Sequence, residues 1–195
     1  MKKILIAAAV GMLVAGQVSA QESPWLVRAR AVKLSMANHD ATGLGLSVDD
    51  KTIPEVDVSY FFSKNIATEL VLTVPQQQQV SSNGTNIGTF VHLPPTLTVQ
   101  YHFTNVNGFT PYVGAGLNYT KISRDNLGGG QYTLEKSSYG YALQAGVNYP
   151  VTKQVSLNLD VKKLNIQSQV YNNGVSAGTL KLDPVLLGVG VGYRF

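Results

Sequence analysis

Side chains that could do chemistry come together around His39 and Asp40, in a polar segment with serines nearby. With a serine, this pair could form the triad of a hydrolase or acyl transferase. Its spacing follows no nucleophile signature, and one His–Asp pair in a polar loop is normally only solvated. The chain has no cysteine and 3 histidines, which excludes thiolate zinc sites, iron–sulfur clusters and cysteine nucleophiles. We therefore expect no enzymatic activity and no cofactor.

Dinucleotides and nucleic acids are also poor candidates as ligands. The glycines at 188, 190 and 192 resemble part of a dinucleotide-binding loop, but no helix follows them. The chain has 15 basic and 11 acidic residues, and without Lys2 and Lys3 the balance is 13 to 11, a net charge of +2. These charges are scattered, whereas nucleic-acid binders gather basic residues on one face. We expect no nucleic-acid partner.

Residues 1–20 are predicted to be a cleaved secretory signal peptide. Lys2 and Lys3 form a basic start, residues 4–16 are an apolar run, and Val18-Ser19-Ala20 offers small residues to signal peptidase. The alternative is a membrane anchor, but the run is shorter than the roughly 20 apolar residues that span a bilayer. Residues 21–195 would then be a single exported domain, without a later segment apolar enough for a membrane helix.

Beyond residue 21, apolar residues recur with a period of two, which is typical of strands. In the last strand, Leu187, Val189 and Val191 alternate with glycines, so one face is continuously apolar. The pattern predicts strands over residues 25–35, 52–62, 66–75, 91–103, 110–121, 137–149, 154–166 and 181–195. Short turns are expected at 63–65, 104–109 and 150–153, and long polar loops at 36–51, 76–90, 122–136 and 167–180. Short turns at one end and long loops at the other are typical of a transmembrane barrel, whose closure satisfies every strand edge in lipid.

A soluble sandwich or lipocalin-like barrel would alternate in the same way, so the direction of the apolar face must decide. The polar faces carry balanced charges, which suit paired ions in a narrow lumen but would also suit a solvated exterior. Aromatic residues favour the membrane, because they gather at strand ends beside the short turns, as an interfacial girdle does. They are Trp25, Tyr60, Phe62, Tyr101, Phe103, Tyr149, Tyr193 and Phe195. The predicted fold class is all-β, an eight-stranded antiparallel transmembrane β-barrel.

Several segments resemble the OmpW family of small outer-membrane barrels. They are residues 54–75, 92–97 and 111–120, and Leu182-Asp183-Pro184 leading to Gly192-Tyr193-Arg194-Phe195. The match is collinear over nearly all of residues 21–195, and Leu-Pro-Pro-Thr-Leu and Pro-Tyr-Val-Gly-Ala-Gly are its specific elements. The resemblance implies a barrel in the outer membrane of a Gram-negative bacterium. It also implies a lumen that is apolar toward the outside and passes small hydrophobic molecules sideways into the membrane.

Pro94 and Pro95 stand where the fourth strand should begin. Proline has no N–H, so two in succession delete neighbouring ladder bonds and bend the strand. From the residues alone, a strand start that tolerates proline is the simpler interpretation. The resemblance favours a gap in the wall at this place, which would serve as the lateral exit.

Charged residues on the inward faces are expected to pair and to form a barrier on the periplasmic side, because an eight-stranded lumen is only just wide enough for side chains. The set is Arg28, Arg30, Glu55, Asp57, Glu69, Asp160 and Arg194. Its role would be structural rather than functional. A solute that met this barrier could not run straight through and would have to leave through the wall.

The lumen is expected to be lined by Val71, Thr96, Thr98, Tyr112 and Lys162. Lys162 departs from the family, in which an aromatic residue is common at this position, and a cation disfavours hydrocarbon contact. This departure argues against a purely hydrophobic selectivity. Lys163 follows directly, so a bulge or the start of the loop-side segment is expected there. Both lysines could instead be rim charges near lipid headgroups.

Tyr193 and Phe195 end the last strand with alternating aromatic residues, which is similar to the signal that the assembly machinery reads in other outer-membrane barrels. We expect a monomeric channel for passive uptake of small, largely hydrophobic molecules. Its partners would be outer-membrane lipids, lipopolysaccharide, the assembly machinery and the hydrophobic solute. The alternative is a closed structural or interaction barrel whose extracellular loops serve as a receptor or adhesion surface.

Overall fold

The computed structural model describes residues 23–103 and 106–195, so the expected signal peptide and its cleavage site lie outside the described residues. Within these ranges most of the chain is extended into strands, with a short 3₁₀ turn, η1 (Gly128–Gly130). No helix among the described residues is long and apolar enough to cross a membrane.

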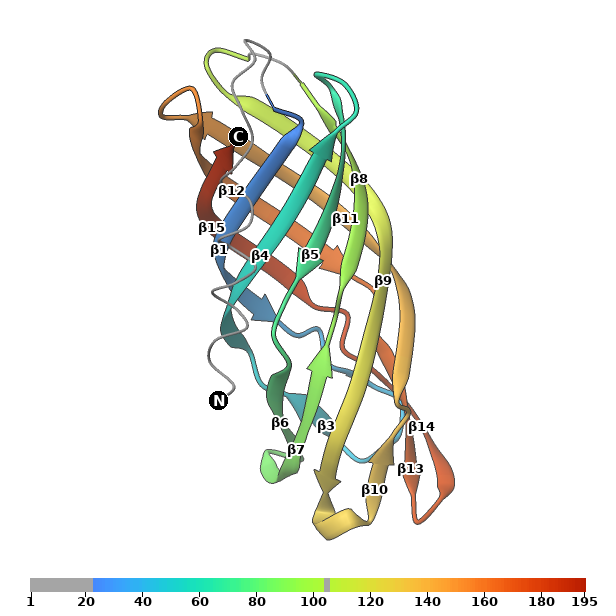
Figure 1. Ribbon diagram of the computed structural model, residues 1–195. Coiled ribbons are helices and arrows are strands. Elements are labelled where there is room, and N and C mark those ends of the chain that lie inside the picture. The colour runs from blue at the N-terminus through green and yellow to red at the C-terminus, as the bar shows by residue number, and fades with distance from the viewer. Residues whose placement is uncertain (1–22, 104–105) are drawn as a thin grey trace, which may run out of the picture.

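Eight long strands close into an antiparallel barrel, as predicted (Figure 1). They are β1 (Trp25–Ser35), β4 (Lys51–Phe61), β5 (Ile66–Leu72), β8 (Thr96–His102), β9 (Thr110–Leu127), β11 (Ser137–Pro150), β12 (Val155–Leu164) and β15 (Val185–Arg194). Each pairs with the next in this order, and β15 returns to pair with β1. The closed order leaves no free edge in the barrel, which is the condition for strands to span lipid.

The pairing of β1 with β15 explains why the last strand has a glycine face. Arg28 pairs with Gly192, and Arg30 pairs with Gly190. A Cβ atom at Gly190 would lie 2.6 Å from Cγ of Arg30, closer than two carbon atoms can approach. The missing side chains therefore make room for two arginines inside the barrel.

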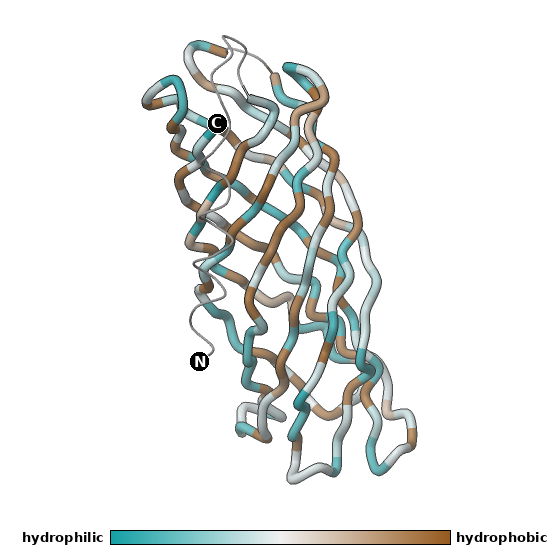
Figure 2. The backbone as a smooth tube through the Cα atoms, viewed as in Figure 1, coloured by the Kyte–Doolittle hydropathy of each residue, from teal (hydrophilic) through white to brown (hydrophobic). Residues whose placement is uncertain are grey.

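The outward faces of the barrel strands are apolar, as the alternation predicts. Hydrophobic and hydrophilic residues alternate along these strands in Figure 2. Val189 is 55% exposed and Val191 is 49% exposed, whereas Leu186, Arg28 and Arg30 are buried. Exposed apolar side chains on a closed barrel are those that contact lipid.

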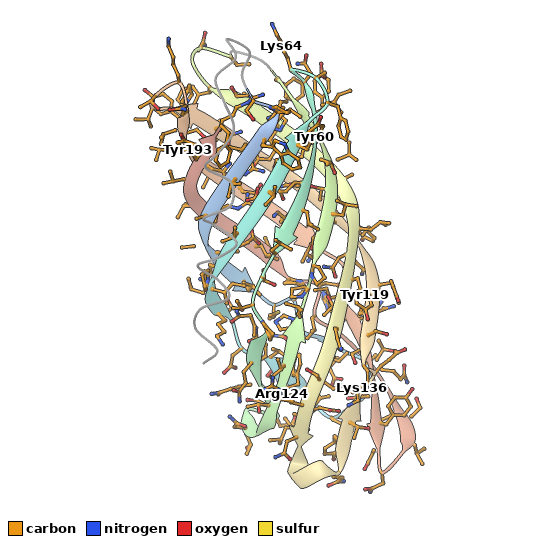
Figure 3. The ribbon with its side chains drawn as sticks, in the orientation of Figure 1. Tyr60, Lys64, Tyr119, Arg124, Lys136 and Tyr193 are labelled. Carbon is orange, nitrogen blue, oxygen red and sulfur yellow. The ribbon has the colours of Figure 1, made fainter. Side chains whose placement is uncertain are left out.

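Aromatic residues form two belts rather than the single girdle that was predicted. The belt at the short-turn end includes Tyr60 and Tyr193, and the ring of Trp25 lies 4.9 Å from that of Tyr60 (Figure 3). The second belt lies nearer the long connections, where the exposed rings of Tyr119 and Tyr139 are 4.9 Å apart. Two aromatic belts mark the two interfaces of a membrane-spanning band.

The long connections are not loops, and here the predicted boundaries were wrong. They contain β2 (His39–Asp40), β3 (Leu46–Val48), β6 (Gln76–Ser82), β7 (Thr85–Leu93), β10 (Tyr132–Leu134), β13 (Gln167–Asn172) and β14 (Val175–Lys181). The predicted strand 91–103 is divided at Pro94 and Pro95 into β7 and β8, and β9 runs on to Leu127. Asn-Gly pairs at 83–84 and 173–174 have positive φ and form the two-residue turns of hairpins β6–β7 and β13–β14.

The interior has two halves of different chemistry. Near the short turns it holds charged and amide side chains, and toward the long connections it holds a buried apolar cluster. The cluster includes Val32, Leu34, Leu46, Val48, Ile53, Val80, Phe90, Ile122, Leu127, Leu134, Leu164, Ile166, Val170, Leu180, Leu182 and Leu186. Side chains therefore fill both halves of the barrel.

Candidate functional site

Six of the seven predicted barrier residues meet in one buried ion network. Arg28 Nε lies 2.8 Å from Asp57 Oδ1, and the same guanidinium donates to Glu69. Arg30 Nη2 lies 2.6 Å from Asp57 Oδ2 and 2.9 Å from Glu55 Oε1. Arg30 also approaches Asp160 Oδ2 at 3.7 Å. Burying charges is unfavourable unless they are paired and hydrogen-bonded, and here each carboxylate faces at least one cation.

Uncharged polar side chains complete this network. Gln100 Nε2 donates to Glu69 Oε2 at 2.9 Å, and Gln144 Nε2 donates to Asp160 Oδ2 at 2.7 Å. The Tyr112 hydroxyl donates to Asp160 Oδ2 at 2.7 Å, and its ring stacks on His102 with 4.9 Å between centroids. The two glutamines were not among the predicted barrier residues, and their only signal in the sequence is their inward phase on the strands. They add hydrogen bonds to carboxylate oxygens of the network, as buried acceptors require.

Arg194 is the seventh residue predicted for the periplasmic barrier. It is the last residue of β15 and lies at the short-turn end, opposite Leu26 of β1. Its Nε donates to the Ser23 carbonyl at 2.9 Å, and its guanidinium carbon lies 4.3 Å from the centre of the Phe61 ring. The side chain covers the end of the barrel rather than the middle of its interior.

Lys162 lies in the ion network and is not a free cation in an apolar lumen. Its Nζ is 3.0 Å from Glu69 Oε1 and 3.4 Å from Glu55 Oε1, and the residue is 1% exposed. The bulge expected at Lys163 is absent from β12, which pairs with both neighbours in regular register. Lys163 points outward because the alternation continues, and its Nζ donates to the Asp183 carbonyl. The rim-charge interpretation is therefore wrong for Lys162.

The other predicted lining residues divide between the two halves of the interior. Thr98 donates to Gln144 Oε1 at 3.1 Å, so Thr98 and Tyr112 belong to the polar half and not to an outer lumen. Val71 and Thr96 line an internal cavity directly beyond the ion network. A water-sized sphere can occupy about 10 Å³ of this cavity. That is room for about one water molecule.

The wall beside this cavity lacks its strand ladder. The β5–β8 pairing ends at Val71 and Thr96, and pairing between the same two stretches of wall resumes only as β6–β7 at Gln76 and His92. The β4–β5 pairing also ends, at Val56 and Leu72. Residues 73–75 therefore cross the wall outside either ladder, opposite Pro94 and Pro95, and we call this stretch the seam.

Pro94 and Pro95 remain attached to the wall on their other side. Tyr119 N donates to the Pro95 carbonyl at 3.1 Å, and Asn118 Nδ2 donates to it at 3.2 Å. Both partners lie on β9, and Tyr119 belongs to the second aromatic belt. The interruption therefore lies between the seam residues of β5–β6 and the proline pair, at the level of one membrane interface.

A second proline break, at Pro184, is held together and shows that proline alone does not open the wall. Leu164 N donates to the Pro184 carbonyl at 3.1 Å, and Ile166 N donates to Asp183 Oδ1 at 2.9 Å. Leu182 N also donates to the Ile166 carbonyl at 2.9 Å. These bonds replace the missing ladder on that side of the barrel.

Asp40, the one carboxylate that suggested catalysis, holds its own loop together. It accepts hydrogen bonds from Thr42 N at 2.9 Å, Thr42 Oγ1 at 2.6 Å and Leu46 N at 3.0 Å. Partial burial acts to raise the pKa of Asp40, but these hydrogen bonds outweigh it and lower the pKa below the ordinary value. Among the described residues there is no group of three His, Asp or Glu side chains that could hold a metal ion.

Similar proteins are found by sequence and by structure. The model of the OmpW family matches residues 15–195. An uncharacterized outer-membrane protein y4mB of Sinorhizobium fredii is 40% identical over 91% of this chain and 82% of its own length. Outer membrane protein W of Escherichia coli is 32% identical over 100% of both chains. The crystal structure of outer membrane protein OprG from Pseudomonas aeruginosa has a TM-score of 0.72 at 22% identity, covers 92% of this chain and 99% of that chain, and shares the fold.

The family match covers residues 15–195, which include every strand of the barrel. The relatives are outer-membrane proteins of Gram-negative bacteria, and this chain is an outer-membrane barrel of the same kind. No family of enzymes is indicated by the matches. The chain belongs to the OmpW family.

Proposed function

We propose that the protein is an outer-membrane channel for passive uptake of small, largely hydrophobic molecules, which leave sideways through the seam. The observation that carries this proposal is the position of the seam directly beside the cavity at the boundary of the two interior halves. An apolar solute that reaches this boundary faces buried ions below and a wall without ladder bonds beside it. Moving apolar groups among buried ions is unfavourable, whereas moving them into lipid is not.

In this account the ion network is a barrier on the periplasmic side. Arg28, Arg30 and Lys162 are each paired with carboxylates, and the two glutamines donate further hydrogen bonds to Glu69 and Asp160. A barrel of eight strands has an interior just wide enough for side chains, so this network leaves no aqueous path. The apolar half would serve as the entrance from the long hairpins.

Replacing Pro94 and Pro95 together with threonine tests the lateral exit. Threonine supplies the N–H groups that proline lacks and favours strand geometry, so the ladder can extend across the seam. We expect protein-dependent uptake of an apolar fluorescent dye to fall at least several-fold. The measurement uses cells with an intact lipopolysaccharide leaflet, because phospholipid vesicles admit such dyes without a protein.

Pro150→Thr is the matched control, since Pro150 is exposed at the short-turn end of β11, far along the barrel from the seam. Its uptake should equal that of the parent. Unchanged uptake in the double variant, with the barrel still folded, would remove the lateral exit. Absence of any protein-dependent uptake in the parent would favour the alternative function, an interaction barrel whose hairpins bind a partner.

We also propose that the barrel is a monomer and that Tyr193 and Phe195 form its assembly signal. Tyr193 is exposed on β15, and Phe195 packs against it with ring centroids 5.0 Å apart. Phe195→Ser should lower the amount of folded protein in isolated outer membranes, measured by the heat-dependent shift of its gel mobility. An unaltered folded fraction would argue against the signal, and a cross-linked dimer in intact cells would argue against the monomer.

A further inference from the structure

The cavity beside the seam contains polar atoms that the protein itself does not satisfy. Thr73 and His92 both line it, from the two sides of the interruption. Thr73 Oγ1 and His92 Nδ1 are buried, and neither has a hydrogen-bond partner in the structure. Buried polar groups are nearly always paired, so two such side chains in the lining of one cavity indicate a place for an external partner. The other buried polar atoms without a hydrogen-bond partner, on Arg28, Arg30 and Asp57, belong to residues of the ion network.

The hydrogen bonding of His92 defines what that partner offers. Gln78 Nε2 lies 3.2 Å from His92 Nε2, and the amide nitrogen is a donor, so this ring nitrogen accepts. The imidazole proton then resides on Nδ1, which becomes a buried donor. Thr73 supplies a hydroxyl that can donate or accept. The two side chains together suit an oxygen atom that accepts a hydrogen bond.

The rest of the cavity excludes most other ligands. Its walls include Leu34, Ile53, Val71 and Leu164, whose side chains offer no hydrogen-bonding groups. The charges at its floor, Glu55 and Lys162, are already paired within the ion network. A charged ligand would find no counterion without breaking that network, so the ligand must be neutral.

The size of the cavity limits how much of the ligand it holds. The space of about 10 Å³ fits one water-sized group, such as a hydroxyl or carbonyl oxygen, but not a whole solute. The carbon chain of the solute must therefore extend out of the cavity. The interrupted wall beside Thr73 is the path along which it can do so.

We propose that Thr73 and His92 form a binding subsite for the oxygen atom of a neutral, oxygenated apolar solute, such as a medium-chain alcohol or ketone. This inference rests on the proposed lateral channel and adds the class of solute. Such a molecule binds its oxygen between the two polar atoms while its chain enters the seam. The interface-level position of the seam suits the same amphiphilic molecule when it leaves.

The test compares 1-octanol with n-octane, which share a carbon chain and differ by one hydroxyl. Protein-dependent uptake of both labelled compounds is measured in cells for the parent and for Thr73→Val, which keeps the side-chain shape. We expect this variant to lower octanol uptake roughly tenfold, because the hydrogen bond between the Thr73 hydroxyl and the octanol oxygen is lost. Octane makes no such bond, so its uptake should be unchanged. Thr68→Val on the preceding strand β5 is the matched control, since the Thr68 hydroxyl donates to the Thr98 carbonyl and Thr68 does not line the cavity.

A second measurement reports on the subsite without transport. The ¹⁵N resonance of His92 Nδ1 in lipid bicelles should shift with added octanol and not with octane. An unchanged octanol-to-octane uptake ratio in Thr73→Val, or an imidazole resonance that octanol leaves unmoved, would overturn the subsite while the channel stands. If neither compound shows protein-dependent uptake, the channel fails, and the resonance alone then decides whether the subsite exists.

Discussion

Replacing Glu69 with leucine is expected to lower the free energy of unfolding by about 3–5 kcal/mol, as breaking a buried ion pair usually does. Glu69 contacts Arg28, Arg30 and Lys162, and it also accepts a hydrogen bond from Gln100. Leucine removes the carboxylate and leaves three buried cations to share fewer acceptors. The loss would come from those cations, which cannot be hydrated inside the barrel.

Urea denaturation in lipid vesicles measures this loss. Trp25 is the only tryptophan of the chain and lies at the short-turn end of β1, so its fluorescence reports on the barrel directly. Glu135→Leu is the control, because Glu135 is an exposed carboxylate and its replacement should change stability by less than about 0.5 kcal/mol. If Glu69→Leu unfolded at the same urea concentration as that control, the ion network would not stabilise the barrel.

Replacing Val189 and Val191 with lysine should cost about 2–4 kcal/mol each if they lie near the middle of the bilayer. Both side chains are exposed on β15, between Leu187 and the aromatic residue Tyr193. A cation there must be buried in hydrocarbon without a partner. The double variant should therefore be destabilised more than either single variant. We expect a strong decrease in its refolding yield in vesicles and in its urea midpoint.

Val175→Lys is the matched control for the lipid face. Val175 is 71% exposed at the start of β14, in a hairpin that extends beyond the barrel. Lysine at this position stays in water and should leave the urea midpoint unchanged within error. Equal midpoints for the parent and the double variant would show that β15 faces a different environment.

The barrel could be predicted because period-two alternation is a local property of each strand. The positions of Val189 and Arg28 in the alternation predict that one points outward and the other inward. No knowledge of distant strands is needed for this. The hairpins beyond the barrel were missed although their signal was present. Asn83-Gly84 and Asn173-Gly174 are the residue pairs that two-residue hairpin turns favour.

The sequence predicts which residues make up most of the ion network, but not which of them pair with one another. The phase of Lys162 predicts that it points inward. Its partners Glu55 and Glu69, however, lie on β4 and β5, which are far from β12 in the sequence. Which inward side chains meet depends on the register of eight strands, and that register is set by the whole barrel. The inward direction of Lys162 could therefore be predicted, but its ion-pair partners could not.

The seam shows the same limit. Pro94 and Pro95 identify one of its sides from sequence, because proline removes ladder donors by its chemistry. The other side, around Thr73, has no residue type that predicts an unpaired strand. Pro184 has the same chemistry as Pro94, but hydrogen bonds from Leu164 and Ile166 close its break. Only the arrangement of neighbours distinguishes the two.

We expect apolar solutes to pass into the membrane while no aqueous path crosses the ion network. The protein is placed in an asymmetric bilayer with a lipopolysaccharide leaflet. Transfer of an apolar reporter and ionic conductance are then measured on the same bilayer. We predict transfer that rises with the amount of protein, while conductance stays at the level of protein-free bilayers. Conductance that rises with protein, or transfer that does not, would contradict the account.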